Sequence, residues 1–136
     1  MTNALPAAPP RWMRYLGFVL SGLVVLFLLM DGTMKLMQLP IVLETTAQIG
    51  WPAVSVVPLG IVLLVCTALY ALPQTTVLGA ILLTAYLGGS VATHARIGSP
   101  ILSHMFFGVY LGVMLWGGLY LRDDRLRALI PYRLKG

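Results

Sequence analysis

The sequence predicts an all-α integral membrane protein built as an antiparallel four-transmembrane-helix bundle. Hydrophobic residues make up 59% of its 136 residues and charged residues only 10%, whereas soluble domains of this size carry about 25% charged residues. Four apolar stretches are each long enough to cross a bilayer, since a helical span needs about 20 predominantly apolar residues. The lipid bilayer is therefore the expected partner of most of the surface.

The predicted transmembrane domain covers residues 15–121, with spans at about 15–37, 51–72, 75–97 and 100–121. The links at residues 73–74 and 98–100 are very short, so the last three spans must run antiparallel to their neighbours. Ser99 followed by Pro100 is a typical helix start, because serine caps the first turn and proline suits the first helical position.

The flanking segments are predicted to lie outside the transmembrane domain. Residues 1–14 read as a proline-rich, disordered cytoplasmic arm and residues 122–136 as a basic cytoplasmic tail. The first apolar run lacks a small-residue cleavage site and is long enough to span, which favours an uncleaved helix over a signal peptide. Residues 39–50 lie between the first two spans and are expected to form a short interfacial helix opened by Pro40.

The basic residues bracket the spans. Of the nine Lys and Arg residues, seven lie in the two flanks and only Lys35 and Arg96 lie between them. A nucleic-acid module would place its basic residues along one face of a polar domain, so the net charge of +5 does not indicate nucleic-acid binding. The positive-inside rule predicts a multi-pass protein with both termini in the cytoplasm.

Polar side chains gather near one end of three spans. Asp31 is in the last turns of the first span, His94 lies four residues before the link at Gly98, and His104 lies four residues into the fourth span. Four residues correspond to about 6 Å of helix, which places these side chains at a similar depth. If the first, third and fourth spans are mutual neighbours, Asp31 and the two histidines meet. The proposed ligand-site residues are Asp31, Lys35, Tyr86, Ser90, His94, Arg96 and His104.

Alternative interpretations exist for each of these residues. Lys35 and Arg96 can extend to the lipid head groups, and a histidine at a helix end often bonds only to a neighbouring polar group. Asp31 is harder to explain in this way, because an Asp within a span costs about 2.5–3.5 kcal/mol on insertion scales. We therefore expect Asp31 to face protein or water.

The remaining motifs indicate packing rather than chemistry. Cys66 is the only cysteine and is expected to be a small core residue. The sequence contains no haem motif and no recognised metal spacing, so no metal site is predicted. Small residues on the third and fourth spans are expected to mediate close helix packing, and they are Ala85, Gly88, Gly89, Ala92, Thr93, Gly112, Gly117 and Gly118.

Four segments together resemble the DoxX-like membrane proteins. They are DGTMKL at 31–36, IGWP at 49–52, LGAILLTAYLGGSVATHARIGSP at 78–100 and VYLGVMLWGGLYLRDDRLRALIP at 109–131. The resemblance covers most of the chain from about Phe18, and it implies a small four-helix protein of the bacterial cytoplasmic (inner) membrane. The positions that match the family pattern are Asp31, Lys35, His94 and Arg96. Many relatives have Glu where Leu63 stands and Asp where Ser99 stands, which argues against a proton relay through the second span.

The resemblance implies a redox-associated role. The family takes its name from a subunit of a terminal oxidase system that reduces quinone, so a quinone is the candidate cofactor and a redox protein the candidate partner. Under this hypothesis His94 or His104 bonds to a quinone carbonyl, and Asp31 orients an imidazole or exchanges a proton with it. Lys35 or Arg96 stabilises negative charge. The alternatives are a binding or transport protein for a small amphiphile and a purely structural subunit. The sequence leaves the ligand, any activity of the chain alone and the oligomeric state open.

Overall fold

The computed structural model describes residues 10–130, which are helical throughout apart from short links. The elements are α1 (Arg11–Leu36), α2 (Pro40–Gln48), η1 (Ala53–Ser55), α3 (Val56–Ala71), α4 (Thr76–Arg96), η2 (Ile101–Met105), α5 (Phe107–Arg122) and α6 (Asp124–Leu129). Four segments are long and apolar enough to cross a membrane, namely Arg11–Leu36, Ala53–Ala71, Thr76–Arg96 and Ile101–Arg122. The predicted class, an all-α membrane bundle of four helices, is confirmed.

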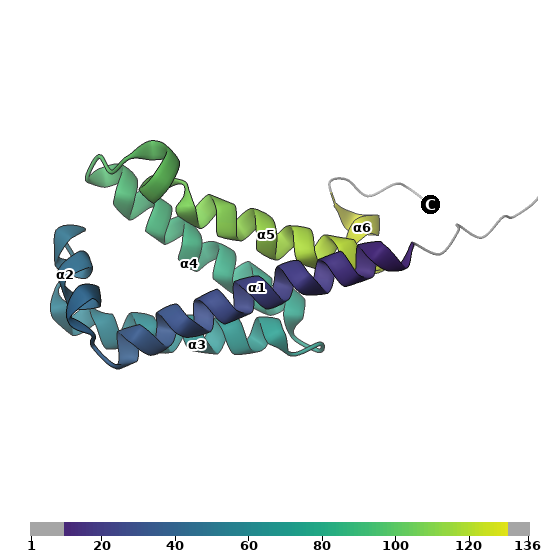
Figure 1. Cartoon of the computed structure of the whole chain (residues 1–136), viewed down its shortest axis with the longest axis horizontal. Helices are drawn as coiled ribbons and strands as arrows, with labels where there is room; N and C mark the ends of the chain where they lie inside the picture. Colours follow the sequence, from purple (N-terminus) through teal and green to yellow (C-terminus); the bar gives the residue numbers. More distant parts are fainter. Residues whose placement is uncertain (1–9, 131–136) are drawn as a thin grey trace, which may run out of the picture.

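The four long helices are arranged around a closed ring of contacts (Figure 1). Helix α1 packs against α3 and α5, and α4 packs against the same two helices, so α1 and α4 lie on a diagonal of the bundle. We call the end where α1 and α4 terminate the α2 end, and the opposite end the α6 end. The expectation that the first, third and fourth spans are mutual neighbours is therefore wrong for the first and third.

Helical structure extends into both predicted flanking segments. Helix α1 begins at Arg11, four residues inside the predicted disordered arm, because Arg and Trp side chains suit the membrane interface and let a helix continue past the apolar core. The predicted tail contains α6, whose first turn is capped by Asp123: its carboxylate accepts hydrogen bonds from the N–H groups of Arg125 and Leu126. The rest of the arm and tail, residues 1–9 and 131–136, lies outside the described residues.

Helix α2 matches the expected helix after the first span and begins, as predicted, at Pro40. The fourth span differs from the prediction, because it does not continue as a regular α-helix from Pro100. Residues Ile101–Met105 form a π-helical turn, in which the N–H of Met105 bonds to the Pro100 carbonyl and that of Phe106 to the Ile101 carbonyl, both at 3.0 Å. A π turn contains more residues than an α turn, so side chains in it face other directions than an α-helical pattern predicts.

At the α6 end the backbones of α1 and α5 are in direct contact. A Cβ atom on Gly118 would lie 2.5 Å from the Ser21 hydroxyl oxygen and 2.9 Å from the Gly17 carbonyl oxygen, so only glycine fits there. Beside this contact, the buried Ser21 hydroxyl lies 2.8 Å from the Tyr70 hydroxyl, which donates to the Leu115 carbonyl at 2.8 Å. This network links α1, α3 and α5 in the apolar interior, where an unpaired polar group would be costly.

The expected packing role holds for only some of the small residues. A Cβ atom added at Gly88, Gly89, Gly112 or Gly117 would lie more than 4 Å from any atom beyond its chain neighbours and its own helix backbone, so these four glycines do not mediate close helix contacts. Of the glycines expected to pack, Gly118 does so. The spacing pattern fails because it identifies a face of small residues without showing which neighbour that face meets.

The adjacent glycines of α5 give a direct test of this contact. We expect Gly118→Ala to destabilise the protein by about 1–3 kcal/mol, the usual cost of overpacking, because the new methyl group would meet the backbone of α1. Gly117→Ala is the control, since its methyl group would enter open space and alanine favours a helix by up to about 1 kcal/mol. Thermal unfolding of both variants in detergent is the measurement, and equal melting temperatures would contradict the proposed contact.

Candidate functional site

A cavity of about 460 Å³ opens at the α2 end of the bundle. Its walls come from α1 and α4, which face each other across the diagonal, with contributions from α3 and α5. Helix α2 lies over it as a roof and contributes Val42, Thr45 and Thr46, and Ile49 directly after the helix also lines it. Ligand sites in proteins usually have volumes of about 300–1,000 Å³, so this cavity is large enough for a small organic molecule.

Most of the cavity wall is apolar. The rings of Phe27 on α1 and Phe107 on α5 stack edge to face, with centroids 5.3 Å apart, and both line the cavity. Leu28, Leu87 and Leu111 are buried members of the bundle core and also line it. An aromatic and aliphatic wall of this kind favours a ligand with an apolar body.

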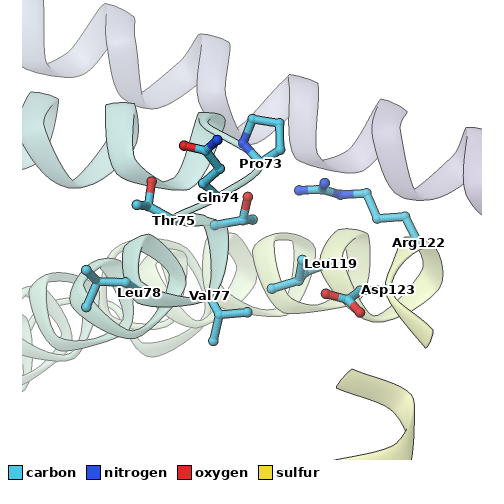
Figure 2. A pocket seen from close by; sticks show the side chains of 9 residues that line it. Pro73, Gln74, Thr75, Val77, Leu78, Leu119, Arg122 and Asp123 are labelled. Atoms are coloured by element: carbon cyan, nitrogen blue, oxygen red, sulfur yellow. The ribbon is translucent and has the colours of Figure 1, made fainter. Parts of the chain in front are cut away.

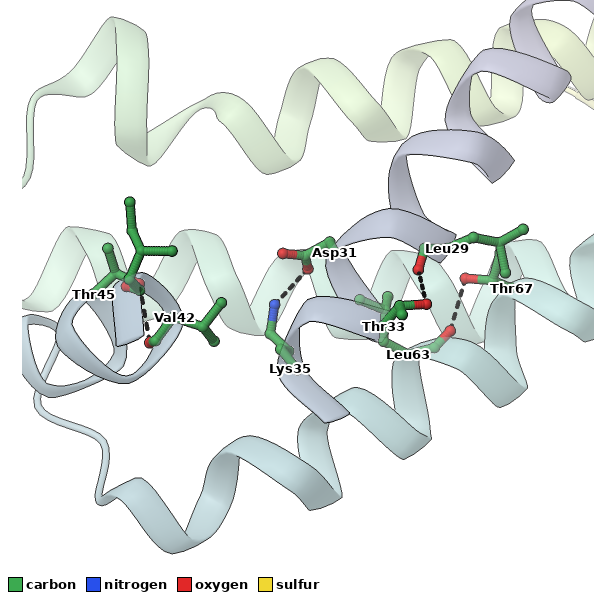
Figure 3. Close-up of polar contacts among 9 residues, drawn as sticks. Leu29, Asp31, Thr33, Lys35, Val42, Thr45, Leu63 and Thr67 are labelled. Carbon is green, nitrogen blue, oxygen red and sulfur yellow. Dashed lines mark hydrogen bonds and ion pairs between the residues drawn. The ribbon is translucent and has the colours of Figure 1, made fainter. Parts of the chain in front are cut away.

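The ion pair between Asp31 and Lys35 lies on the α1 side of the cavity (Figure 3). Lys35 Nζ donates to Asp31 Oδ2 at 2.5 Å, one helical turn apart, and the two side chains are 18% and 35% exposed. The aliphatic part of the Lys35 side chain packs against α3 at Gly60. A Cβ atom added to Gly60 would lie only 2.8 Å from the Lys35 Cβ. Asp31 thus faces a polar partner and the cavity, which offsets part of its cost within an apolar helix.

Unpaired hydroxyl groups come from α4 and from the roof. Tyr86, Ser90 and His94 follow one another at four-residue spacing on α4, and all three line the cavity. Among residues 10–130, the hydroxyls of Tyr86 and Ser90 have no hydrogen-bond partner, and neither has that of Thr46 on α2. Each is free to bond to a ligand that carries polar atoms.

The two histidines lie close to each other but differ in their relation to the cavity. Their ring centroids are 6.2 Å apart. The His94 Nδ1 atom lies 2.9 Å from the Ser99 hydroxyl and the His104 Nδ1 atom 2.8 Å from that of Ser103. Within the described residues neither ring bonds to a carboxylate, so the expectation that Asp31 orients an imidazole is not met.

Arg96 ties the roof to α4. It lies outside the cavity, and its Nη2 atom donates to the Ile49 carbonyl at 3.0 Å. The Trp51 indole N–H donates to the Thr93 hydroxyl at 3.4 Å. The roof helix is flanked by two residues with positive φ, Gln38 at 52° and Gly50 at 84°, so the chain turns sharply at both ends of α2.

The structure brings together five of the seven sequence-predicted site residues around one cavity, namely Asp31, Lys35, Tyr86, Ser90 and His94. Arg96 and His104 do not line it: Arg96 points to the roof connection, and His104 is exposed on the π turn. The depth argument used the rise per residue alone, and depth does not fix the direction of a side chain. No group of three metal-ligating side chains occurs in the part of the chain that the structure describes.

Sequence reasoning missed several lining residues. Phe27 and Phe107 stand inside apolar runs, where nothing distinguishes a cavity-lining aromatic side chain from one facing lipid. Thr46 looks like an ordinary residue of the predicted interfacial helix. Trp51 lies between Gly50 and Pro52. Its place in the IGWP segment, one of the four that resemble the DoxX-like proteins, was the sequence feature that could have pointed to a role for it.

The fold and the cavity define a class: a small polytopic α-helical membrane protein with a ligand-sized cavity near one end of its bundle. The model of the DoxX-like family matches residues 19–118. The chain belongs to this family, since the match spans most of its length and all four long helices. Comparisons with curated proteins and with solved structures give no match.

The ion pair can be tested by removing one partner or both. We expect Lys35→Met to lower stability by about 1–3 kcal/mol, less than for a fully buried pair, because Asp31 is left in an apolar wall and must stay partly hydrated or become protonated. The double variant Asp31→Asn/Lys35→Met should recover most of this loss. Unfolding of the single and double variants in detergent is the measurement. A double variant no more stable than Lys35→Met would contradict the pairing.

The roof connection predicts a local effect on dynamics. Arg96→Gln removes the hydrogen bond to Ile49, so backbone amides of residues 40–48 should exchange roughly five- to tenfold faster, which corresponds to about 1 kcal/mol. Hydrogen–deuterium exchange with mass spectrometry measures this. Arg125→Gln, an exposed charge at the α6 end, is the control. Unchanged exchange in α2 of the Arg96 variant would show that Arg96 does not hold the roof.

Proposed function

We propose that the chain is a redox-associated subunit whose cavity at the α2 end binds the ring of a quinone. The observation that supports this most is the composition of the wall, in which aromatic and aliphatic side chains surround a few groups able to donate hydrogen bonds. A quinone ring is flat and apolar and has two carbonyl oxygens that only accept hydrogen bonds, so it needs donors at its edge and apolar surface at its faces.

The donors are available on two sides of the cavity. Lys35 on α1 has further N–H groups besides the one that bonds to Asp31. The Tyr86 hydroxyl on α4 is unpaired among the described residues and lines the same space. Asp31 holds the lysine in place, and His94 borders the cavity with its Nδ1 atom bonded to Ser99. These residues bind and orient the ring, and the apolar wall excludes water.

Electrons would come from a partner protein. A bound quinone supplies chemistry that takes up or releases two electrons, but the sequence contains no haem or metal motif that could deliver them. The resemblance described above implies a bacterial cytoplasmic membrane, and the distribution of Lys and Arg favours cytoplasmic termini. In that orientation the cavity lies toward the outer leaflet, where a membrane-dissolved ligand reaches it.

Quinone binding can be tested with Trp51, which lines the cavity. In a chain whose other tryptophans are replaced (Trp12→Phe, Trp116→Phe), ubiquinone-1 should quench the fluorescence of Trp51 in a saturable way. Gly89→Leu should raise the Kd at least tenfold, or about 1.4 kcal/mol, because Gly89 lines the cavity and its new side chain would enter it.

Gly88→Leu is the matched control for this experiment. Gly88 is the preceding residue on α4 and its surroundings are also open, but it does not line the cavity. Its Kd should stay within about twofold of the parent chain. Equal Kd values in the Gly88 and Gly89 variants would contradict a site in this cavity. Displacement of ubiquinone-1 by an amphiphile of similar size without carbonyl groups would favour the alternative function, binding of a non-redox amphiphile.

A further inference from the structure

A second cavity, of about 280 Å³, lies at the α6 end (Figure 2). The link between α3 and α4 forms one side, with Pro73, Gln74 and Thr75, and the end of α5 forms the other, with Leu119 and Arg122. Figure 2 shows the Arg122 side chain extending toward Pro73 and Gln74. Nothing in the quinone proposal uses this cavity, which is at the opposite end of the bundle.

The Arg122 guanidinium group is held in position by three contacts. Its Nε atom donates to the Ser21 hydroxyl at 3.3 Å. Its Cζ atom lies 5.1 Å from the ring centroid of Phe18 and 5.9 Å from that of Tyr70, within range of cation–π interaction. Ser21 and Tyr70 are themselves buried and bonded to each other, so the guanidinium rests on a rigid part of the bundle.

No carboxylate among residues 10–130 forms an ion pair with this guanidinium group, although the Asp123 carboxylate also lines the cavity. The neighbouring Asp123 uses its carboxylate to cap α6, where it accepts from two backbone N–H groups. The ion pairs within the described range join Asp31 to Lys35 and Asp124 to Arg127. The two Nη atoms of Arg122 therefore keep their N–H groups free of protein acceptors in that range, beside an open cavity.

We propose that the cavity at the α6 end binds a phosphate group, with Arg122 as its main ligand. A guanidinium group binds phosphate through two parallel hydrogen bonds, and here it is already oriented, so little rotamer freedom is lost on binding. The cavity lies at the end of the membrane-spanning part of α5, a depth at which lipid head groups occur. The phosphate therefore comes either from an acidic lipid or from a soluble phosphate compound, and the experiment separates these sources.

The test measures thermal unfolding of the full chain in a maltoside detergent, which contains no phosphate. The probes are dioctanoyl phosphatidic acid, inorganic phosphate and, as the phosphate-free control, dioctanoylglycerol. At a large excess over Kd, a ligand that binds only the folded state should raise Tm by roughly 5 °C. We expect this rise with phosphatidic acid and not with dioctanoylglycerol.

Arg122→Gln should abolish the rise, and Arg125→Gln should keep it. Arg125 is the matched control because it carries the same charge three residues away, is exposed and does not line the cavity. Since Arg122→Gln also loses the bond to Ser21, Gln74→Glu provides a second variant. Gln74 is exposed on the wall of the cavity. A carboxylate at this position, toward which Arg122 extends, competes with phosphate for the guanidinium group, whereas the Asp123 carboxylate is occupied by the N–H groups of α6.

Each outcome decides the proposal. A rise with phosphatidic acid alone, lost in both cavity variants, assigns the site to a lipid. A rise with inorganic phosphate as well, lost in the same variants, assigns it to a soluble phosphate compound. An equal rise in the wild type, Arg122→Gln and Gln74→Glu overturns the proposal, as does no rise with either phosphate probe or an equal rise with dioctanoylglycerol.

Discussion

The backbone contact between α1 and α5 at Gly17 and Gly118 is the constraint on which the rest of the bundle depends. Because neither glycine has a side chain, the backbones of the two helices approach more closely there than they could with any larger residue at these positions. Farther along, at Gly32 and Gly60, α1 packs closely against α3 instead. Helix α1 therefore lies close to α5 at the α6 end and close to α3 toward the α2 end. The space between α1 and α4 at the α2 end is the cavity under α2.

Much of this fold could be predicted from the sequence, because the bilayer leaves few options for an apolar chain. Backbone polar groups must be paired internally, so four apolar stretches of sufficient length become four helices, and short links make them antiparallel. Details that depend on tertiary contacts could not be predicted. The π turn before α5 and the open surroundings of Gly88, Gly89 and Gly117 depend on which neighbours the helices meet.

The candidate site was predictable to the extent that polar residues are costly in an apolar helix. Asp31 stood out for that reason, and the structure places it on one cavity with Lys35 and Tyr86. The same reasoning could not separate them from Arg96 and His104. Rise per residue gives the depth of a side chain, whereas its direction depends on helix rotation, on the diagonal arrangement of α1 and α4, and on the extra residue in the π turn.

The bonded pair of Asp31 and Lys35 has a consequence for a protein whose helices cross a membrane. A transmembrane voltage acts on net charge, with about 2.3 kcal/mol per elementary charge moved across 100 mV. The two side chains have opposite charges and are only one helical turn apart, so together they present a short dipole rather than a charge. A voltage across the membrane therefore exerts little net force on this part of α1, and the pair adds little to the electrical work of any movement of that helix end.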